Sequence, residues 1–278
     1  MYFLMKSRFF IYFISLTLLA ACTPTSNQQQ SEAEQPAESV QLVESAQTID
    51  TNLPLEQPAA IPARPEQILK RDHYMVSYNS ETMQPNWVAW KLTKAHTYGN
   101  TPRPQNAFRE DEEVAQPRAT LADYRSRKWS RGHLCPAGDN KWDADAMYDT
   151  FLLTNICPQN YDMNDGVWNE IEMACRQWAR KYGEVYIVCG PLFTKSTHET
   201  IGPHHIPVPE AFFKVVLRMK PEPQAIGFLC RNAAITGTED QYVQSVDEVE
   251  RVTGIDFFPA LPDEIETKVE SSSRWKNW

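Results

Sequence analysis

The sequence predicts an α+β fold for the main body of this 278-residue chain. Segments rich in aromatic and β-branched residues are grouped around a few helical segments, without the regular strand–helix alternation that is typical of a parallel α/β sheet. The firmest helix is predicted over residues 166–181, where apolar residues recur at helical spacing and Gly183 provides a stop. The sequence contains no internal repeat.

The other elements are predicted in chain order by local patterns. Residues 74–78 and 87–92 predict two strands that are joined as a hairpin by residues 79–85, and residues 143–153 predict a helix. Three more strands and a last short helix are expected after residue 184, over residues 185–189, 212–219, 225–230 and 245–254. The last helix opens with Ser245 and Glu248 in the spacing of a capping box and ends at Gly254.

The N-terminal 65 residues are expected to lie outside this body. Residues 1–21 are typical of a signal peptide, because two basic residues precede an apolar run that is shorter than the roughly 20 residues needed to span a bilayer. The segment Leu19-Ala20-Ala21-Cys22 resembles the lipobox of bacterial lipoproteins, which implies a lipid on Cys22. An uncleaved anchor is the alternative. Either interpretation places the body outside the cytoplasm, tethered to a membrane of the cell envelope, with the outer membrane as the expected one.

Residues 22–65 are expected to form a disordered linker, since they are rich in Gln, Ser, Glu, Pro and Ala and hold too few apolar groups to offset the entropy of ordering. The folded domain is then expected over residues 66–278. The net charge of −9 argues against a protein that coats nucleic acid by bulk electrostatics. Between Lys94 and Arg131, however, eight basic residues stand against five acidic ones. This local excess indicates either a site for an anionic ligand or a solvated loop.

A first candidate site is the sequence Arg131-Gly132-His133. In an extended segment the two outer side chains point to the same side. An arginine can hold a phosphate with two hydrogen bonds, and a neutral imidazole can accept a proton near pH 7. Taken alone, this tripeptide is more typical of a surface turn.

A second candidate site follows in the region of the predicted helix. Asn164 stands near its start, and Glu172 lies eight residues further on, about 12 Å along a helix axis. A carboxamide oxygen suits Mg²⁺, and a nearby carboxylate can hold the waters that the ion keeps. The alternative is that Asn164 is only a helix cap and Glu172 only a solvated helix residue.

Several separated segments together resemble the DNA/RNA non-specific endonuclease family, the ββα-metal nucleases of the endonuclease G type. The resemblance extends over residues 71–265 in the order of the family, and it implies a central antiparallel sheet flanked by helices. The segments that carry it are residues 106–111, 131–133, 154–159, 164–172, 185–193, 206–215 and 253–258.

This resemblance implies a metal-dependent endonuclease that cleaves DNA and RNA with little sequence preference, using one Mg²⁺ for which Mn²⁺ can substitute. His133 would be the general base, Asn164 the metal ligand, Glu172 the residue that positions metal-bound waters, and Asn155 a support of the site. Arg131 would contact phosphate. The arginine that stabilises the transition state would be Arg103 or Arg109, because both flank Phe108.

One position departs from the family pattern, because Ser130 stands where an Asp is expected before Arg131. This departure keeps two alternatives open: a catalytically weak nucleic-acid-binding module, and a phosphodiesterase that acts on another phosphodiester of the envelope.

Three further groups are less informative. A zinc site at His198, His204 and His205 lacks a matched Cys or carboxylate pattern. Five Cys remain after Cys22, and the sequence does not decide between disulfides and buried thiols. The tryptophans at positions 87, 90, 168 and 178 are expected in the core rather than on a base-stacking platform.

Overall fold

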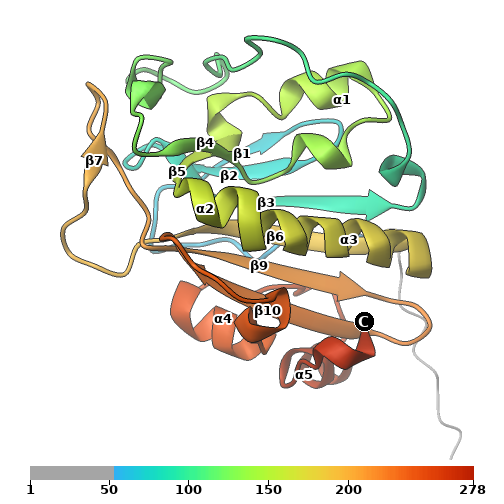
Figure 1. Ribbon diagram of the computed structural model, residues 1–278. Helices are drawn as coiled ribbons and strands as arrows, with labels where there is room; N and C mark the ends of the chain where they lie inside the picture. Colours follow the sequence, from blue (N-terminus) through green and yellow to red (C-terminus); the bar gives the residue numbers. More distant parts are fainter. Residues whose placement is uncertain (1–52) are drawn as a thin grey trace, which may run out of the picture. The chain divides into compact units, whose positions relative to one another are not determined.

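The computed structural model describes residues 53–278, which are built around a seven-stranded antiparallel sheet with the order β1-β2-β3-β6-β9-β10-β11 (Figure 1). The strands of this sheet are β1 (Gln67–Lys70), β2 (Met75–Asn79), β3 (Gln84–Thr93), β6 (Glu184–Leu192), β9 (Ala211–Arg218), β10 (Gln224–Arg231) and β11 (Val243–Gln244). Two short ribbons lie outside it, β4 (Ser130–His133) with β5 (Ile156–Gln159), and β7 (Thr200–Ile201) with β8 (Ile206–Pro207).

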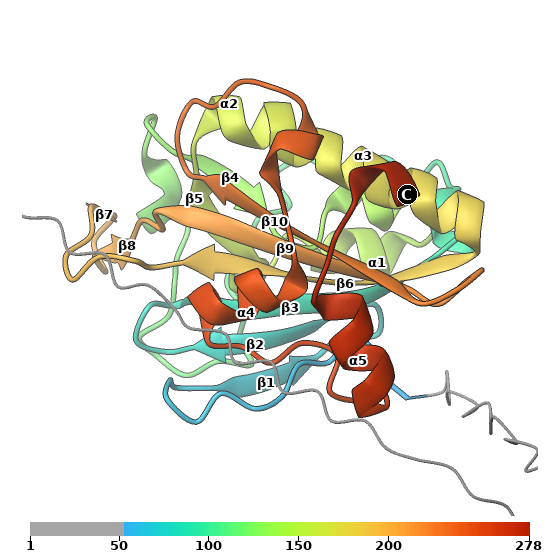
Figure 2. The same ribbon diagram turned by 90° about the horizontal axis from the view of Figure 1, so that it is seen from below.

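Helices cover both faces of the sheet (Figure 2). The long helix α3 (Asn169–Tyr182) packs on one face, while α4 (Val246–Thr253) and α5 (Asp263–Glu270) pack on the other. Each face of the sheet has its own hydrophobic core, called here the α3 core and the α4–α5 core after the helices that pack there. Side chains alternate along β6, so this strand contributes to both: Ile187 points into the α3 core, whereas Tyr186 and Val188 point into the α4–α5 core. The shorter helices α1 (Ala144–Asp149) and α2 (Tyr161–Met163) lie in the connections that carry β4 and β5.

Most elements that the sequence predicts are present. The expected hairpin is formed by β2 and β3, and the three later strands appear as β6, β9 and β10. Helix α3 ends at Gly183, whose φ of +96° is a backbone conformation that favours glycine. Ser245 caps α4 by accepting a hydrogen bond from the backbone N–H of Glu248, but the Glu248 carboxylate pairs with Arg251.

Two expectations need correction. The helix at residue 245 is not the last one, because α5 follows it. Residues 53–65, which were expected to belong to the linker, pack on the body: Leu55 and Ile61 are buried in the α4–α5 core, and the Ala59 N–H donates to the Asp256 carbonyl. The packed body therefore begins before residue 66.

The expected signal peptide, the lipidation site Cys22 and the linker up to residue 52 lie outside the described residues. Within residues 53–278, no helix is long and apolar enough to cross a membrane.

Candidate active site

Residues from both candidate motifs line one open pocket of about 600 Å³. The β4 strand brings Arg131 and His133 to it, and the start of α3 with the turn before it brings Asn164 and Glu172. The charged lining is mostly basic, with Arg103, Arg131, Lys141 and Arg176 against Asp165 and Glu172. The two motifs are therefore parts of a single site suited to an anionic ligand.

His133 packs against two aromatic rings that also contact each other, and it is buried. Its ring packs edge-on against Phe151, with centroids 4.9 Å apart, and lies 5.4 Å from Phe108. Burial, reinforced by the charges of Arg103 and Arg131, lowers the pKa of His133 to about 3. The imidazole is thus neutral near pH 7, and its Nε2 has no hydrogen-bond partner among the described residues. It is available as a proton acceptor.

The same two rings support the two pocket arginines. The Arg131 guanidinium lies over Phe108 at 4.3 Å from the ring centroid, and the Arg103 guanidinium lies over Phe151 at 5.0 Å. Cation–π contact leaves the N–H groups at the edge of each guanidinium free to donate to a ligand. The pocket thus presents two oriented cations close to a neutral imidazole.

Arg109 does not share this position. Its guanidinium donates to Asp149 Oδ1 at 2.9 Å and to the Tyr148 carbonyl at 2.6 Å, and it stacks over the Tyr148 ring at 3.6 Å. It borders a different cavity, which is rich in acidic residues. Of the two arginines between which the sequence leaves the choice open, only Arg103 lines the pocket of His133.

Asn164 lies inside a helical region that kinks at Gly166, and it is not the cap of that region. Asn160 caps this region, since its side chain accepts from the backbone N–H groups of Asp162 and Met163. Asn164 begins a π-helical turn over Asn164–Trp168, and its Nδ2 donates to Asp165 Oδ1 at 3.3 Å. A π-helical turn is frequent at functional sites. Here the side-chain oxygen of Asn164 is not used for capping and is available to a ligand.

Glu172 is not a solvated helix residue either. Its side chain is only 12% exposed, and burial raises its pKa to about 7 although Lys214 and Arg176 oppose this shift. Arg176 lies one turn further along α3, 3.9 Å from the Glu172 carboxylate, and also pairs with the buried Asp139 at 2.7 Å. A carboxylate buried in this way at a pocket wall suits contact with a cation or with ordered waters.

Lys214 on β9 lies beneath this wall and is fully buried. Its ammonium stands over the rings of Trp168 and Trp90, at 4.4 and 5.1 Å from their centroids. Its Nζ has no hydrogen-bond partner among the described residues, so the rings and the nearby Glu172 and Asp139 carboxylates balance its charge.

Asn155 supports the site from outside the pocket. Its side chain is fully buried, donates to the carbonyls of Cys135 and Thr150 at 2.9 and 2.8 Å, and accepts from the Cys135 N–H at 2.9 Å. These bonds fix the chain immediately after His133. Asn155 is therefore placed to position the end of β4 and not to touch a ligand.

Ser130, the departure from the family pattern, does not line the pocket. Its hydroxyl donates to the Gln159 carbonyl at 2.9 Å across the β4–β5 ribbon. Gly132 stands between the site residues Arg131 and His133, and a Cβ there would lie only 1.9 Å from Gln159 Oε1. Ser130 thus contributes to the ribbon that carries Arg131 and His133.

Four polar pocket residues were not singled out in the sequence: Lys141, Asp165, Asn169 and Arg176. For two of them a signal was present, because Asn169, Glu172 and Arg176 follow one another at intervals of three and four and so share one face of α3.

The remaining candidate groups have structural roles. His198 pairs with Glu210 and His204 with Asp123, so these two histidines do not converge on a zinc site. All five described cysteines are buried free thiols. The four tryptophans are buried, as expected.

Comparison with known sequences shows which family this chain belongs to. The profile of the DNA/RNA non-specific endonuclease family matches residues 57–264, three quarters of the chain. The chain therefore belongs to the DNA/RNA non-specific endonuclease family.

Individual relatives agree with this membership. Mitochondrial nuclease EXOG of Danio rerio is 38% identical over 206 residues, which cover 68% of this chain and 60% of that protein. Human mitochondrial endonuclease G is 33% identical and covers 70% of each chain, and a nuclease of Nostoc is 28% identical over 92% of this chain and 94% of its own. This chain thus spans less than two thirds of the length of the EXOG relatives that it matches.

A solved structure of EndoG in its complex with EndoGI superposes on this fold with a TM-score of 0.67 and 26% identity, covering 71% of this chain and 87% of that one. The expected ββα-metal fold, with its antiparallel sheet flanked by helices, is confirmed.

Proposed function

We propose that this protein is a metal-dependent endonuclease that hydrolyses phosphodiester bonds of DNA and RNA with little sequence preference. The observation that carries the proposal is the convergence of a neutral His133, two oriented arginines and the oxygen-bearing side chains of Asn164 and Glu172 in one open pocket. Family membership over most of the chain supports it.

In this proposal His133 is the general base. Its neutral imidazole lines the pocket, and its buried Nε2 has no hydrogen-bond partner among the described residues, so the ring can accept a proton from the attacking water. Arg131 and Arg103 bind the phosphate oxygens and neutralise the charge that develops in the transition state. Asn155 keeps His133 in place through its hydrogen bonds to Cys135, two residues further on.

The residues present fit a hard divalent cation. Asn164 offers a neutral amide oxygen and Glu172 a buried carboxylate, and both are ligand types that Mg²⁺ accepts while it keeps several waters; Mn²⁺ accepts the same donors. When bound there, such an ion would polarise the phosphodiester and stabilise the leaving oxygen. Asn164 would be the direct ligand, and Glu172 would hold waters of the ion.

The proposed lack of sequence preference follows from the kind of contacts that the pocket residues can make. Arg103, Arg131, Lys141 and Arg176 suit phosphate groups, and phosphate contacts carry no sequence information. A purely binding role has less support, since Ser130, the one departure from the family pattern, lies off the pocket lining.

The experiment compares cleavage of plasmid DNA and of RNA by the wild type, His133→Ala and Asn164→Ala, with Mg²⁺ or EDTA. The wild type should degrade both substrates only with metal, His133→Ala should be inactive but still bind DNA, and Asn164→Ala should lose the response to Mg²⁺. The exposed His205 provides the control His205→Ala. An unchanged cleavage rate in His133→Ala would refute the assigned base. A competition experiment tests the substrate class: excess plasmid or RNA should inhibit cleavage of any other phosphodiester. If it does not, a phosphodiester of the cell envelope is the favoured substrate.

We also propose, from the sequence of residues 1–22, that the protein is exported and anchored to a membrane of the cell envelope by a lipid on Cys22. Fractionation of cells that express Cys22→Ala tests this, because the variant should leave the membrane fraction. Persistent membrane association would contradict a lipid on Cys22.

A further inference from the structure

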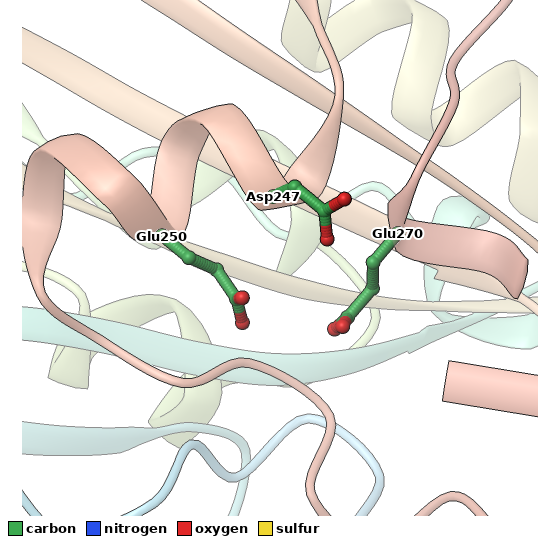
Figure 3. Close-up of side chains that lie close together, drawn as sticks. All are labelled: Asp247, Glu250 and Glu270. Carbon is green, nitrogen blue, oxygen red and sulfur yellow. The ribbon is translucent and has the colours of Figure 1, made fainter. Parts of the chain in front are cut away.

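A second group of carboxylates lies far from the active-site pocket, where α4 meets α5. Figure 3 shows the side chains of Asp247, Glu250 and Glu270 pointing toward one another. One ligand atom from each lies within 4.8 Å of the other two. Asp247 and Glu250 are three residues apart and share one face of α4, and Glu270 is the last residue of α5.

Glu270 is the unusual member of this group. It is only 5% exposed, and its Oε1 has no hydrogen-bond partner among the described residues. A buried carboxylate without a partner is costly, because it has lost its hydration and gained nothing in return. Its carboxylate lies close to the other two carboxylates, an arrangement that would be repulsive if all three were charged and nothing lay between them (Figure 3).

The charges around Glu270 increase this cost. Its pKa is raised to about 9, first by burial and then by Glu250, Glu266, Asp247 and Asp256. All the groups that shift it are carboxylates. Among residues 53–278, the ion pairs include none to Asp247, Glu250 or Glu270.

One member of the group is already oriented for ligation. Glu250 Oε1 accepts a hydrogen bond of 2.7 Å from the backbone N–H of Phe257, which fixes the carboxylate. Asp247 is exposed, so the group opens to solvent on one side. Three carboxylates with an open side match the coordination of Ca²⁺, which takes six to eight oxygen ligands in flexible geometry and completes its shell with waters.

We propose that Asp247, Glu250 and Glu270 bind a hard divalent cation, Ca²⁺ in preference to Mg²⁺, which ties the end of α5 to α4. The site is separate from the active site, since α4 and α5 lie on the face of the sheet opposite to α3 (Figure 2). The ion therefore stabilises the fold and does not take part in cleavage. The competing occupant is a proton shared between Glu250 and Glu270.

The test uses the full-length protein with Asn164→Ala, which removes the proposed catalytic metal ligand, so that the two metal sites are not confused. After treatment with EDTA and dialysis, thermal unfolding is followed with increasing CaCl2 or MgCl2. Saturating Ca²⁺ should raise Tm by about 5 °C or more, with a smaller effect of Mg²⁺ at equal concentration. Equilibrium dialysis with Ca²⁺ alone should give one bound ion per chain.

Two variants in this background decide the assignment. Glu270→Gln should abolish the Ca²⁺-dependent rise of Tm, whereas Glu264→Gln, an exposed residue of the same helix, should leave it unchanged. Asp247→Asn replaces an exposed ligand and should weaken Ca²⁺ binding by about tenfold without unfolding the protein. If Glu270→Gln does not fold, Asp247→Asn alone therefore tests whether these carboxylates bind Ca²⁺.

Cleavage of DNA separates this proposal from the proposed function. In the otherwise wild-type chain, Glu270→Gln and Asp247→Asn should keep the Mg²⁺-dependent cleavage rate. The proposal is overturned if Ca²⁺ leaves Tm unchanged, which would assign the site to a proton, or if the rise of Tm is the same in Glu270→Gln, Asp247→Asn and Glu264→Gln. Either result would leave the assignment of the active site standing.

Discussion

At the scale of single residues, the two arginines that flank Phe108 in the sequence have opposite surroundings. Arg103 lies over the Phe151 ring, close enough for its charge to act on His133. The charge of Arg109 is instead neutralised by an ion pair with Asp149. We expect Arg103→Ala to lower kcat by about 100- to 1000-fold, as the loss of one charge-stabilising group does at other active sites. Arg109→Ala should stay within about threefold of the wild type, because Arg109 does not line the pocket and the partly exposed ion pair that the substitution removes contributes little.

Cleavage of a short fluorescent duplex at saturating Mg²⁺ measures both variants, with binding to DNA followed separately. A kcat that falls in Arg109→Ala and not in Arg103→Ala would reverse the assignment.

The protonation of His133 gives a second prediction at this scale. Burial together with Arg103 and Arg131 lowers its pKa to about 3, so that the imidazole is already neutral well below pH 7. In metal-free protein, the NMR resonances of the His133 ring should not move between about pH 5 and pH 8. The resonances are assigned by their absence in His133→Ala. Arg103→Gln should raise the pKa, and titration of the wild-type ring near 6.5 would contradict the buried, cation-flanked environment.

At the scale of elements, Asp123 fastens the β7–β8 ribbon to the body. Its buried carboxylate accepts from the N–H and Nδ1 of His204, both at 2.9 Å, and from the N–H and Oγ1 of Thr120, both at 2.8 Å. Burial alone would raise the pKa of Asp123, but these hydrogen bonds outweigh it and the pKa lies below its ordinary value of 3.8. The ionised form is therefore the one that the fold stabilises.

From this we predict that Asp123→Asn lowers the free energy of unfolding by about 2–3 kcal/mol at pH 7. Since the folded-state pKa is depressed, the contribution of the carboxylate is complete above its ordinary pKa and is lost as the pH falls through the lower folded value. Urea unfolding of both proteins at several pH values should show the difference shrinking toward about pH 3.5. A difference that is constant with pH would show that the ionised carboxylate is not responsible.

The sequence predicts the helices and strands better than it predicts the side-chain contacts between them. The β2–β3 hairpin and α3 follow from residue periodicity, which acts locally and is visible in one chain. The choice between Arg103 and Arg109 depends on which loop side chain meets Phe151 or Asp149, and these contacts are made only after folding. The capping role of Asn160 in place of Asn164 has the same cause, since either Asn can begin a helix.

On the scale of the whole molecule, the central sheet separates the candidate active site on one face from an apolar core on the other. The α3 face carries the candidate active-site pocket, in and beneath which buried polar groups are incompletely paired, as shown by His133 Nε2 and Lys214 Nζ. Groups of this kind cost stability. The opposite face holds a second apolar core, to which α4, α5 and residues 53–65 contribute. The apolar packing of that face offsets the cost of the pocket, and its integrity therefore decides whether the site exists at all.

Residues 53–65 have the composition of a linker, but their apolar residues are part of the core between the sheet and helices α4 and α5. Leu55 is fully buried there, whereas its neighbour Leu53 is 44% exposed. Leu55→Ala should lower the free energy of unfolding by about 2–4 kcal/mol, because it removes buried methyl groups and leaves a cavity, and Leu53→Ala should have little effect. Urea unfolding of the two variants beside the wild type measures this difference. Equal stabilities for the two variants would mean that the segment contributes nothing to the core, and the folded domain would then begin at residue 66, as the composition suggests.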